Sequence, residues 1–283
     1  MKIAQFSTRA RTGYGVVSGN SIIEPTEGFS SRYETLQAVL ADDALHALAK
    51  DVDGRPASIS LDDVQLLPPL GPANKVICVG INYRKKYPVE GAAPEPDHII
   101  LFAKHHDAIV GHGQPLELPR GEAADTFDYE GEIVLVIGKG GRHITRAQAR
   151  DHIAGYTIMD DGSVRGWQKH SLHAGKNFAR SGGCGPWIVT ADEIEDINRM
   201  TLTTAVNGET RQQTNVASMI FPPDELVAYI SHFTPLAAGD LIATGSPEGA
   251  GGSFSPPKFL RAGDEIEITV SGVGKLRNRV DGA

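Results

Sequence analysis

An acidic cluster is the first feature of the sequence that could carry out chemistry. Glu130 and Glu132 stand two residues apart, where the apolar run EIVLVIG of residues 132–138 begins. Residues i and i+2 of a strand point to the same face, so the two carboxylates should lie side by side. Neighbouring carboxylates repel each other unless a cation or a shared proton lies between them. Asp161, in an acidic pair that ends a second predicted strand, would add a third carboxylate.

Three convergent carboxylates with no neighbouring His or Cys favour a hard cation that prefers oxygen ligands. We therefore predict a Mg²⁺ or Mn²⁺ site on Glu130, Glu132 and Asp161, with Ca²⁺ as a further candidate. The alternative is that Glu130 and Glu132 form the solvent-exposed face of an edge strand, since acidic side chains are mostly exposed. The spacing alone leaves both interpretations open.

Basic and amide side chains follow the acidic cluster. Arg165, Gln168 and Lys176 stand four, seven and fifteen residues after Asp161. If Arg165 and Gln168 share a helical turn, they lie on one face of it. Together with a metal they could hold a carboxylate and stabilise a developing oxyanion. The alternative is a solvated basic helix followed by a loop, in which long side chains keep their charges in water.

Two further segments could contribute to a site. The turn Thr244-Gly245-Ser246 directly follows a predicted strand, and backbone N–H groups in such a turn can bind a carboxylate. His105 and His106 follow Lys104, and an imidazole could act as a general base because it titrates near neutral pH. Most histidines are structural, so the sequence offers His105 as a candidate only.

Short apolar strands and turns rich in glycine must position these residues. We predict strands over residues 2–6, 15–18, 21–23, 76–79, 99–102, 132–138, 155–159, 187–190, 201–206, 241–244, 265–270 and 274–277. Helices are predicted over residues 33–40, 43–50, 145–152 and 223–232. Many short strands with few helices indicate a β-rich α+β fold, because a doubly wound fold requires regular alternation of strands and helices.

The proline-rich run of residues 66–72 cannot continue a helix or a sheet ladder, since proline lacks the backbone donor. We therefore predict a boundary there, between a small N-terminal α/β domain of residues 1–70 and a catalytic domain of residues 71–283. The chain has 283 residues, enough for this division.

Charge and hydropathy restrict the partners. With 27 basic and 35 acidic residues the net charge is −8, which argues against a nucleic-acid partner but leaves room for an anionic small molecule near local Lys and Arg. No apolar run approaches the roughly 18 residues of a membrane span, and the first residues lack the apolar core of a signal peptide. We expect a cytoplasmic protein without a membrane or nucleic-acid partner.

The chain resembles the fumarylacetoacetate hydrolase family through several motifs that occur in one order. They are VICVGINY at 76–83, DYEGEIVLVIG at 128–138, GYTIMDD at 155–161, GKNF at 175–178, GPWIVT at 185–190, GDLIATGSPEG at 239–249 and GKLRNRV at 274–280. The resemblance implies a mixed β-sandwich roll and, usually, a homodimer. It also implies a metal site in which the E-x-E pair and a following Asp correspond to Glu130, Glu132 and Asp161.

The same resemblance implies roles for the other candidates. Lys176, Arg165 and Gln168 would orient and polarise a 2-oxo-acid substrate. The turn of Thr244, Gly245 and Ser246 would receive the carboxylate of that substrate. Lys104 is similar to a lysine that lines the same pocket, and Tyr83, in the motif that precedes the lid, is a further candidate for substrate binding.

One motif departs from the family. Hydrolytic members carry N-Y-x-x-H-x-x-E in a lid helix, where His and Glu activate water. Here Lys86 stands in place of the His and Val89 in place of the Glu. His105 or His106 could replace the missing pair, and Lys86 could act if burial kept it neutral.

The sequence therefore predicts a divalent-metal-dependent enzyme that acts on a small 2-oxo (diketo) acid. Hydrolytic cleavage of a C–C bond through an enolate stabilised by the metal is the leading prediction, because most of the family are hydrolases. Decarboxylation or keto–enol isomerisation of an acid similar to oxaloacetate or hydroxymuconate is the alternative. A third hypothesis is a non-catalytic homologue that binds metal and acid but has lost the chemistry of the lid.

Overall fold

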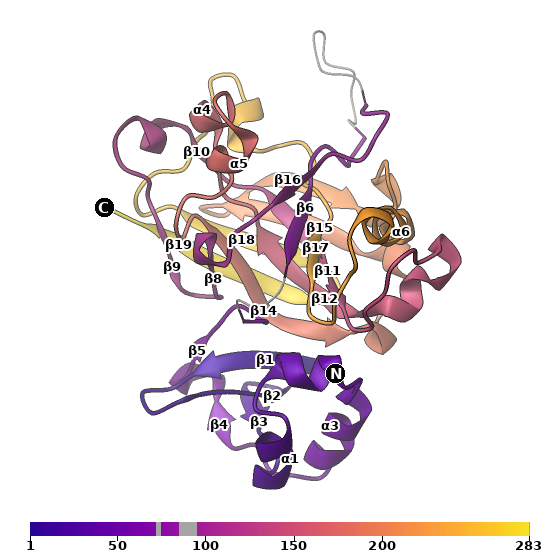
Figure 1. The fold of residues 1–283 in the computed structure, drawn as a ribbon. Coiled ribbons are helices and arrows are strands. Elements are labelled where there is room, and N and C mark those ends of the chain that lie inside the picture. The colour runs from indigo at the N-terminus through magenta and orange to yellow at the C-terminus, as the bar shows by residue number, and fades with distance from the viewer. Residues whose placement is uncertain (72–74, 85–94, 283) are drawn as a thin grey trace.

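The structure is a computed structural model that describes residues 1–71, 75–84 and 95–282. A mixed sheet of 12 strands crosses the molecule, and a second sheet of 5 strands packs on one of its faces (Figure 1). The path of the large sheet is β4-β3-β2-β1-β14-β12-β11-β17-β6-β7, and the smaller sheet has the order β16-β15-β18-β19-β9. The predicted β-rich α+β fold is confirmed.

The large sheet is built from short strands. They are β1 (Lys2–Ser7), β2 (Thr12–Ser18), β3 (Ser21–Ile23), β4 (Ile59–Ser60), β5 (Gln65–Leu66), β6 (Val76–Val79), β7 (Leu101–Ala103), β8 (Ile109–Val110), β11 (Gly131–Ile137), β12 (Ile153–Asp160), β14 (Gly182–Thr190) and β17 (Leu241–Ala243). The smaller sheet contains β9 (Pro115–Glu117), β15 (Thr201–Val206), β16 (Glu209–Asn215), β18 (Glu265–Val270) and β19 (Gly274–Asp281), while β10 (Phe127–Asp128) pairs with β13 (Ser163–Val164).

The α-helices are short. They are α1 (Glu27–Arg32), α2 (Leu36–Ala41), α3 (Leu45–Val52), α4 (Arg165–Gln168), α5 (Leu172–Gly175) and α6 (Pro223–Phe233). The predicted helix at 145–152 is a 3₁₀ helix, Arg146–His152, which begins with a capping box between Thr145 and Gln148. In the part of the chain that the structure describes, no helix is long and apolar enough to cross a membrane.

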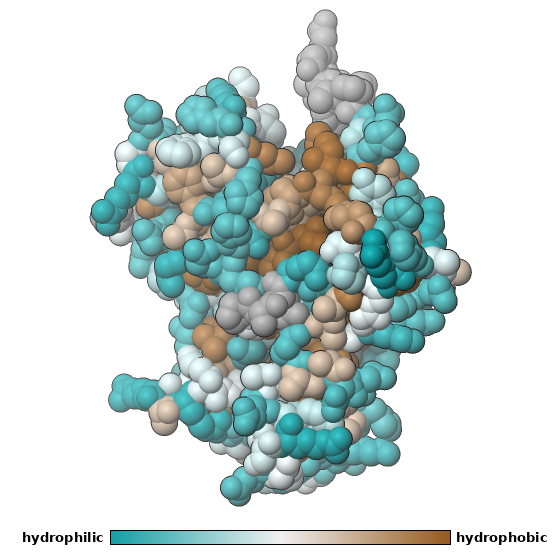
Figure 2. All heavy atoms as spheres, viewed as in Figure 1, coloured by the Kyte–Doolittle hydropathy of each residue, from teal (hydrophilic) through white to brown (hydrophobic). Residues whose placement is uncertain are grey.

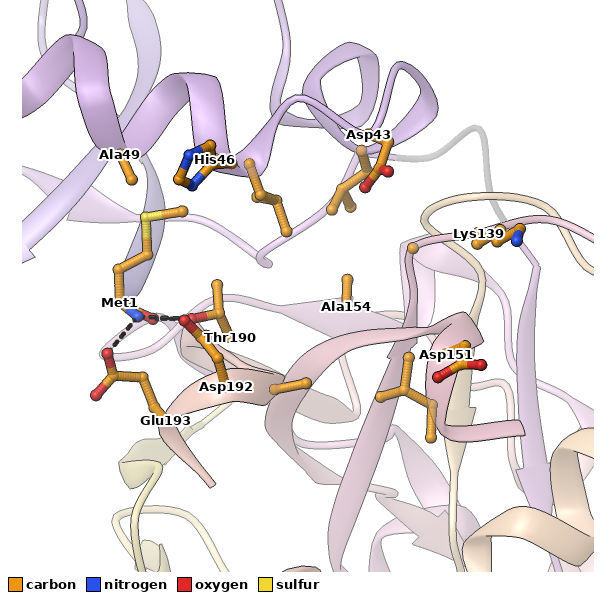
Figure 3. A pocket seen from close by; sticks show the side chains of 15 residues that line it. Met1, Asp43, His46, Ala49, Lys139, Asp151, Ala154, Thr190, Asp192 and Glu193 are labelled. Carbon is orange, nitrogen blue, oxygen red and sulfur yellow. Dashed lines mark hydrogen bonds and ion pairs between the residues drawn. The ribbon is translucent and has the colours of Figure 1, made fainter. Parts of the chain in front are cut away.

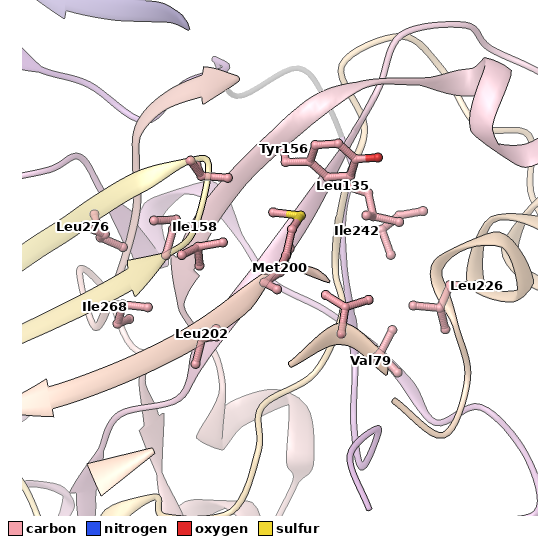
Figure 4. Packing of buried hydrophobic residues seen from close by; sticks show 14 of the residues in the cluster. Val79, Leu135, Tyr156, Ile158, Met200, Leu202, Leu226, Ile242, Ile268 and Leu276 are labelled. Atoms are coloured by element: carbon pink, nitrogen blue, oxygen red, sulfur yellow. The ribbon is translucent and has the colours of Figure 1, made fainter. Parts of the chain in front are cut away.

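The centre of the core is β11, which is buried on both faces. Ile133 and Leu135 belong to the cluster between the two sheets, where Leu135, Ile158, Ile268 and Leu276 converge (Figure 4). Val134 and Val136 point to the other face and pack in the cluster that includes Leu36, Val39 and Leu48 of the N-terminal helices. A strand covered on both faces reads as a continuous apolar run, which is why this strand was predictable. Because β11 lies between β12 and β17, the edge-strand alternative is wrong.

The N-terminal part joins the large sheet directly. β1 pairs antiparallel with β14, with Ile3 opposite Ile188. The ammonium of Met1 donates to Thr190 Oγ1 at 2.6 Å and lies 2.9 Å from Glu193 Oε1, beside a cavity of about 550 Å³ between α3 and the large sheet (Figure 3). The division of the chain near residue 70 stays a prediction.

A helix of the N-terminal part and a strand of the smaller sheet are among the elements that differ from the sequence prediction. The helix predicted at 33–40 begins at Leu36, because the side chain of Thr35 accepts the N–H of Ala38 and caps it there. β16 was not predicted, since it lies at an edge of the smaller sheet and its mostly polar side chains show little alternation.

Candidate metal centre and substrate pocket

The three predicted carboxylates converge. Glu130, Glu132 and Asp161 each offer an oxygen within 4.8 Å of the other two. The antiparallel register of β11 and β12, with Gly131 opposite Asp160, brings the start of one strand to the end of the other. The N–H of Asp161 also donates to the carbonyl of Glu130 at 2.8 Å. Glu132 is 1% exposed and Asp161 is fully buried, so this is an interior site rather than an acidic surface.

Gly131 keeps the two glutamates on one face. Its own face packs against the smaller sheet, where a Cβ would lie 2.1 Å from Thr204 Oγ1. Its N–H donates to Gln212 Oε1 at 3.0 Å. A side chain at this position would therefore push β11 away from the second sheet and disturb the convergence of the carboxylates.

Two lysines neutralise the centre of the carboxylate cluster. Lys176 Nζ lies 2.6 Å from Asp161 Oδ2 and also contacts Glu130 Oε2, while Lys104 Nζ lies 2.7 Å from Asp161 Oδ1. Burial by itself would raise the pKa of Asp161, but Lys104 and Lys176 outweigh it and lower the pKa to about 2. Burial, together with the charges of Asp161 and Glu130, raises the pKa of Glu132 well above its ordinary range.

Lys104 lies behind the cluster. Its three ammonium donors reach Asp161 Oδ1, the carbonyl of Gly162 at 3.1 Å and the carbonyl of Lys176 at 2.7 Å. Its side chain is fully buried. All three donors are therefore used, and the structure places Lys104 beneath Asp161 instead of against the substrate pocket described below.

Helices α4 and α5 carry the basic and amide candidates. Arg165 lies on α4 with Nε 2.7 Å from Asp128 Oδ2 and Nη1 2.7 Å from Glu130 Oε1. Gln168 Oε1 lies 3.5 Å from Arg165 Nη1, one helical turn away as the spacing predicted. Gly175 closes α5 against α4, because a Cβ there would lie 2.4 Å from Gln168 Cγ. This close packing places Lys176, the next residue, over the carboxylates.

A pocket of about 390 Å³ opens beside the carboxylate cluster, and we call it the substrate pocket. Both apolar and polar or charged side chains line it. The residues that line it are Val79, Gly80, Ile81, Tyr83, Ile100, Phe102, Glu130, Arg165, Gln168, Leu172, Lys176, Ser246, Pro247 and Glu248. The hydroxyl of Tyr83 and the Nε2 amide of Gln168 are buried without a hydrogen-bond partner in the described part of the chain.

Asn82 fixes the segment that carries Tyr83. Its side-chain amide donates to the carbonyl of Thr244 at 2.7 Å and accepts from the N–H of Phe221 at 2.8 Å. Burial, and then the charge of Glu132, raises the pKa of Tyr83, so its hydroxyl stays protonated at neutral pH. Tyr83 is 5% exposed, which makes it a buried donor on the wall of the pocket.

The turn of residues 244–246 contributes in three different ways. Ser246 lines the substrate pocket. The N–H of Gly245 donates to Glu132 Oε2 at 2.9 Å, and the hydroxyl of Thr244 donates to the carbonyl of Ile133 at 2.8 Å. Gly245 has a φ of +97° and a Cβ there would lie 2.7 Å from Asn82 Cβ, so this position requires glycine. The turn thus orients a metal-ligating candidate from behind.

The remaining candidates lie elsewhere. His105 is exposed and lines a separate groove along β7, with its ring centroid 4.8 Å from that of His173. Its backbone N–H donates to Asn177 Oδ1 at 2.6 Å. The structure does not bring His105 to the carboxylates. Lys86 and Val89 lie outside the described residues.

Asp128 is a residue whose part the sequence reasoning missed. It is fully buried and accepts the N–H groups of Gly251 at 2.6 Å and Gly252 at 2.9 Å, in addition to Arg165 Nε. The signal in the sequence was the position of Asp128 at the start of the acidic run, together with the glycine-rich segment 249–252. Asp128 therefore ties this loop to the arginine that contacts Glu130.

The donor set fits a hard divalent cation. Three carboxylates supply only oxygen ligands, as Mg²⁺ and Mn²⁺ prefer. Asp160 adds a fourth carboxylate next to them, with Oδ1 2.9 Å from the N–H of Glu130 and Oδ2 buried without a partner in the described part of the chain. Burial raises the pKa of Asp160 to about 7. This excess of buried acid is what a bound cation would compensate.

Known proteins resemble this chain in sequence and in structure. The family described as fumarylacetoacetate (FAA) hydrolase, C-terminal, matches residues 75–281. Oxaloacetate tautomerase YisK of Bacillus subtilis (strain 168) is 40% identical over 225 residues, which cover 78% of this chain and 74% of that protein.

Solved structures cover the full length. A 2-hydroxyhepta-2,4-diene-1,7-dioate isomerase from Mycobacterium marinum aligns over 100% of this chain and 98% of its own, with 31% identity and a TM-score of 0.78. Maleylpyruvate hydrolase from Sphingobium sp. SYK-6, in complex with manganese(II) and pyruvate, aligns over 100% of both chains with 26% identity and a TM-score of 0.83. With its ordered motifs, its fold and its buried carboxylates, the chain belongs to the fumarylacetoacetate hydrolase family, whose members are enzymes acting on 2-oxo acids.

Proposed function

We propose that this enzyme binds a divalent cation and interconverts the keto and enol forms of a small 2-oxo acid. The observation that carries the proposal is the pairing of a buried carboxylate cluster with hydrogen-bond donors that have no partner among the described residues, all beside one pocket. A tautomerisation moves one proton between the oxygen on C2 and the carbon C3. It needs a polarised 2-oxo group and no activated water.

Glu130, Glu132 and Asp161 would hold the cation. When bound, the cation supplies Lewis-acid polarisation of the 2-oxo group. Mg²⁺ and Mn²⁺ suit the all-oxygen donor set, and the Sphingobium relative contains manganese(II) with pyruvate. The N–H of Gly245 and the ammonium of Lys104 keep Glu132 and Asp161 in orientation from the side away from the pocket.

The side chains on the pocket wall act on the substrate oxygens. Lys176 lies against Glu130 and Asp161, and with a cation on the same oxygens its ammonium would be available to the substrate. Among the described residues that line the pocket, Gln168 Nε2 and the hydroxyl of Tyr83 are buried donors without a hydrogen-bond partner, and we assign to them hydrogen bonds with the reacting oxygen and the substrate carboxylate. Arg165 holds Glu130, and Ser246 lines the same pocket.

Hydrolysis is the second candidate. The resemblance to a family of hydrolases and to maleylpyruvate hydrolase supports it. It requires a group that activates water, and the described residues lining the substrate pocket include no histidine. The tautomerase relative is 40% identical, whereas solved structures of hydrolases are 33% and 26% identical. These observations favour proton transfer over cleavage.

We also propose a homodimer. Large apolar side chains are exposed on α6, with Tyr229 at 43% and Phe233 at 56%, and Phe233 borders the groove along β7. Figure 2 shows apolar residues gathered over the region of β6. Buried apolar area is the main driving force of association, so a second copy would cover this face. Light scattering coupled to size exclusion should give twice the chain mass, and Phe233→Asp should shift the protein towards monomer.

Parallel measurement of enol loss and of pyruvate release tests the proposed reaction. The enol absorbance of oxaloacetate reports tautomerisation, and a lactate dehydrogenase couple reports pyruvate released by cleavage or decarboxylation. Metal-stripped protein should be inactive, and added Mg²⁺ or Mn²⁺ should restore loss of enol without release of pyruvate. Pyruvate release at the rate of enol loss would contradict tautomerisation and favour the lytic reactions.

A further inference from the structure

The cavity of about 550 Å³ between α3 and the large sheet lies far from the carboxylate cluster. It is found where β11 and β14 end and β12 begins (Figure 3). The carboxylates stand at the opposite ends of β11 and β12. Because β12 contains 8 residues, roughly 25 Å separate the two places. The described residues that line the cavity include none of those that line the substrate pocket, so the two are distinct.

Apolar side chains line this cavity from both of its sides. Leu45 and Ala49 belong to α3, and Ile153 and Ala154 belong to β12. The volume falls in the range of small-molecule sites, which are mostly apolar and often lie between packed units of a protein. The cavity can therefore take up a ligand that packs carbon atoms against these side chains.

The charged lining of the cavity is mainly acidic. Apart from the imidazole of His46, its charged groups are four carboxylates and two ammonium groups, those of Asp43, Asp151, Asp192, Glu193, Lys139 and Met1. The ammonium of Met1 is paired with Glu193. Asp43 and Asp151 lie away from that pair (Figure 3), and neither forms an ion pair within the described part of the chain. The local charge therefore favours a cation over an anion.

We propose that this cavity binds a small organic cation with an apolar body, of the class of primary alkylamines. The ammonium pairs with the carboxylates of Asp43 and Asp151, and the alkyl chain packs against Ala49 and Ala154. A bare metal ion is a poorer match, because among the described residues the acidic groups of this cavity do not converge as metal ligands do. The proposal is independent of the reaction proposed above.

Probes of one chain length separate the role of charge from that of apolar contact. Hexylamine is cationic, hexanol is neutral and hexanoate is anionic at pH 7. We would measure dissociation constants on the full-length protein by calorimetry and ligand-detected NMR. For hexylamine we expect a Kd of about 1 mM. Hexanoate should bind about tenfold more weakly or worse, with hexanol between them, and high salt should narrow these differences.

Variants of the lining locate the bound amine. Asp43→Asn and Asp151→Asn should each weaken hexylamine roughly threefold and leave hexanol within about twofold. Ala49→Phe should weaken both compounds, because the ring occupies the space of the alkyl chain. Glu34→Gln, at an exposed residue of the N-terminal part outside the cavity lining, is the control with the same change in net charge and should alter neither affinity. If Ala49→Phe does not fold, the two Asn variants decide the question.

Saturation with Mn²⁺ and oxalate, which would fill the metal centre and the substrate pocket, should leave the affinity for hexylamine unchanged. Competition would place the amine in the substrate pocket and overturn the proposal. Equal affinities for hexylamine and hexanoate, no detectable binding of hexylamine, or identical binding in all the variants would also overturn it. A protein without tautomerase activity should still bind the amine, so failure of the proposed function leaves this result distinguishable.

Discussion

The ammonium nitrogen of Lys176 lies 2.6 Å from Asp161 Oδ2, at the point where three carboxylates converge. Burial opposes the charge on Lys176, but Asp161 and Glu130 outweigh burial and raise its pKa. The lysine therefore supplies part of the positive charge that these carboxylates require. A cation bound to the same oxygens would compete with Lys176, and this competition would link occupancy of the metal site to the availability of the lysine.

Replacement of Lys176 by Met should separate metal binding from catalysis. Without the competing ammonium, the affinity for Mn²⁺ should stay equal or increase. Turnover should fall about 10²-fold or more, because a donor to the reacting oxygen is lost. Calorimetric titration with Mn²⁺ and measurement of kcat on the same preparation test both statements. A parallel loss of metal affinity and kcat would show that Lys176 only supports the structure of the site.

Replacement of Glu132 by Gln should abolish measurable binding of Mn²⁺ at concentrations that saturate the wild type. The metal-free variant should remain at least as stable as the wild type, since the raised pKa of Glu132 means that the buried carboxyl favours its protonated form. In the wild type, protons compete with the cation for Glu132, so the affinity for Mn²⁺ should weaken as the pH falls. Glu34→Gln, at an exposed residue of the N-terminal part, is the matched control. An affinity for Mn²⁺ that did not change with pH would contradict this account.

Replacement of Asp128 by Asn should loosen the 249–252 loop and the arginine together. The carboxylate of Asp128 accepts hydrogen bonds from the N–H groups of Gly251 and Gly252 and from Arg165 Nε. The side-chain amide of Asn has only one acceptor oxygen and cannot accept all three. We expect a loss of about 1–3 kcal/mol in the free energy of unfolding and a rise in KM larger than the fall in kcat. Urea unfolding and steady-state kinetics measure these effects. Asp125→Asn, an exposed neighbour, should change neither.

Replacement of Asp160 by Asn should change how the stability of the metal-free protein depends on pH. The pKa of Asp160 rises from 3.8 to about 7 on burial, so the folded state binds its proton more tightly than the unfolded state. This contribution is complete below about pH 4 and is lost as the pH rises to about 7. Relative to the wild type, Asp160→Asn should therefore gain stability between these values, by about 4 kcal/mol at most. Urea unfolding in EDTA at several pH values measures the gain. If the free energy of unfolding depended on pH in the same way in the variant and the wild type, the prediction would be contradicted.

The sequence was most informative where local pattern and burial coincide. The β-branched run at 132–138 predicted β11 to within one residue, because a strand covered on both faces must be apolar throughout. The i,i+2 spacing of Glu130 and Glu132 and the acidic end of the next strand predicted the carboxylate cluster, because antiparallel pairing joins the end of β12 to the start of β11.

The sequence was least informative where partners come from distant segments. From the sequence, a charged residue such as Lys104 is expected in a pocket or in solvent. Its acceptors instead come from the turn that follows β12 and from the end of α5, and its side chain is completely buried. The orientation of His105 follows from its contact with His173, which no local pattern encodes.

The central claim is that the buried carboxylates and their cation turn a 2-oxo acid into its enolate, and exchange of the C3 protons tests it most directly. The wild-type protein is incubated with 2-oxobutyrate in D₂O, and NMR follows the loss of the C3 proton signal. We predict rapid exchange with Mg²⁺ or Mn²⁺, none above the buffer rate after removal of the metal, and none with Glu132→Gln. Exchange at the buffer rate by the metal-loaded wild type would contradict the account.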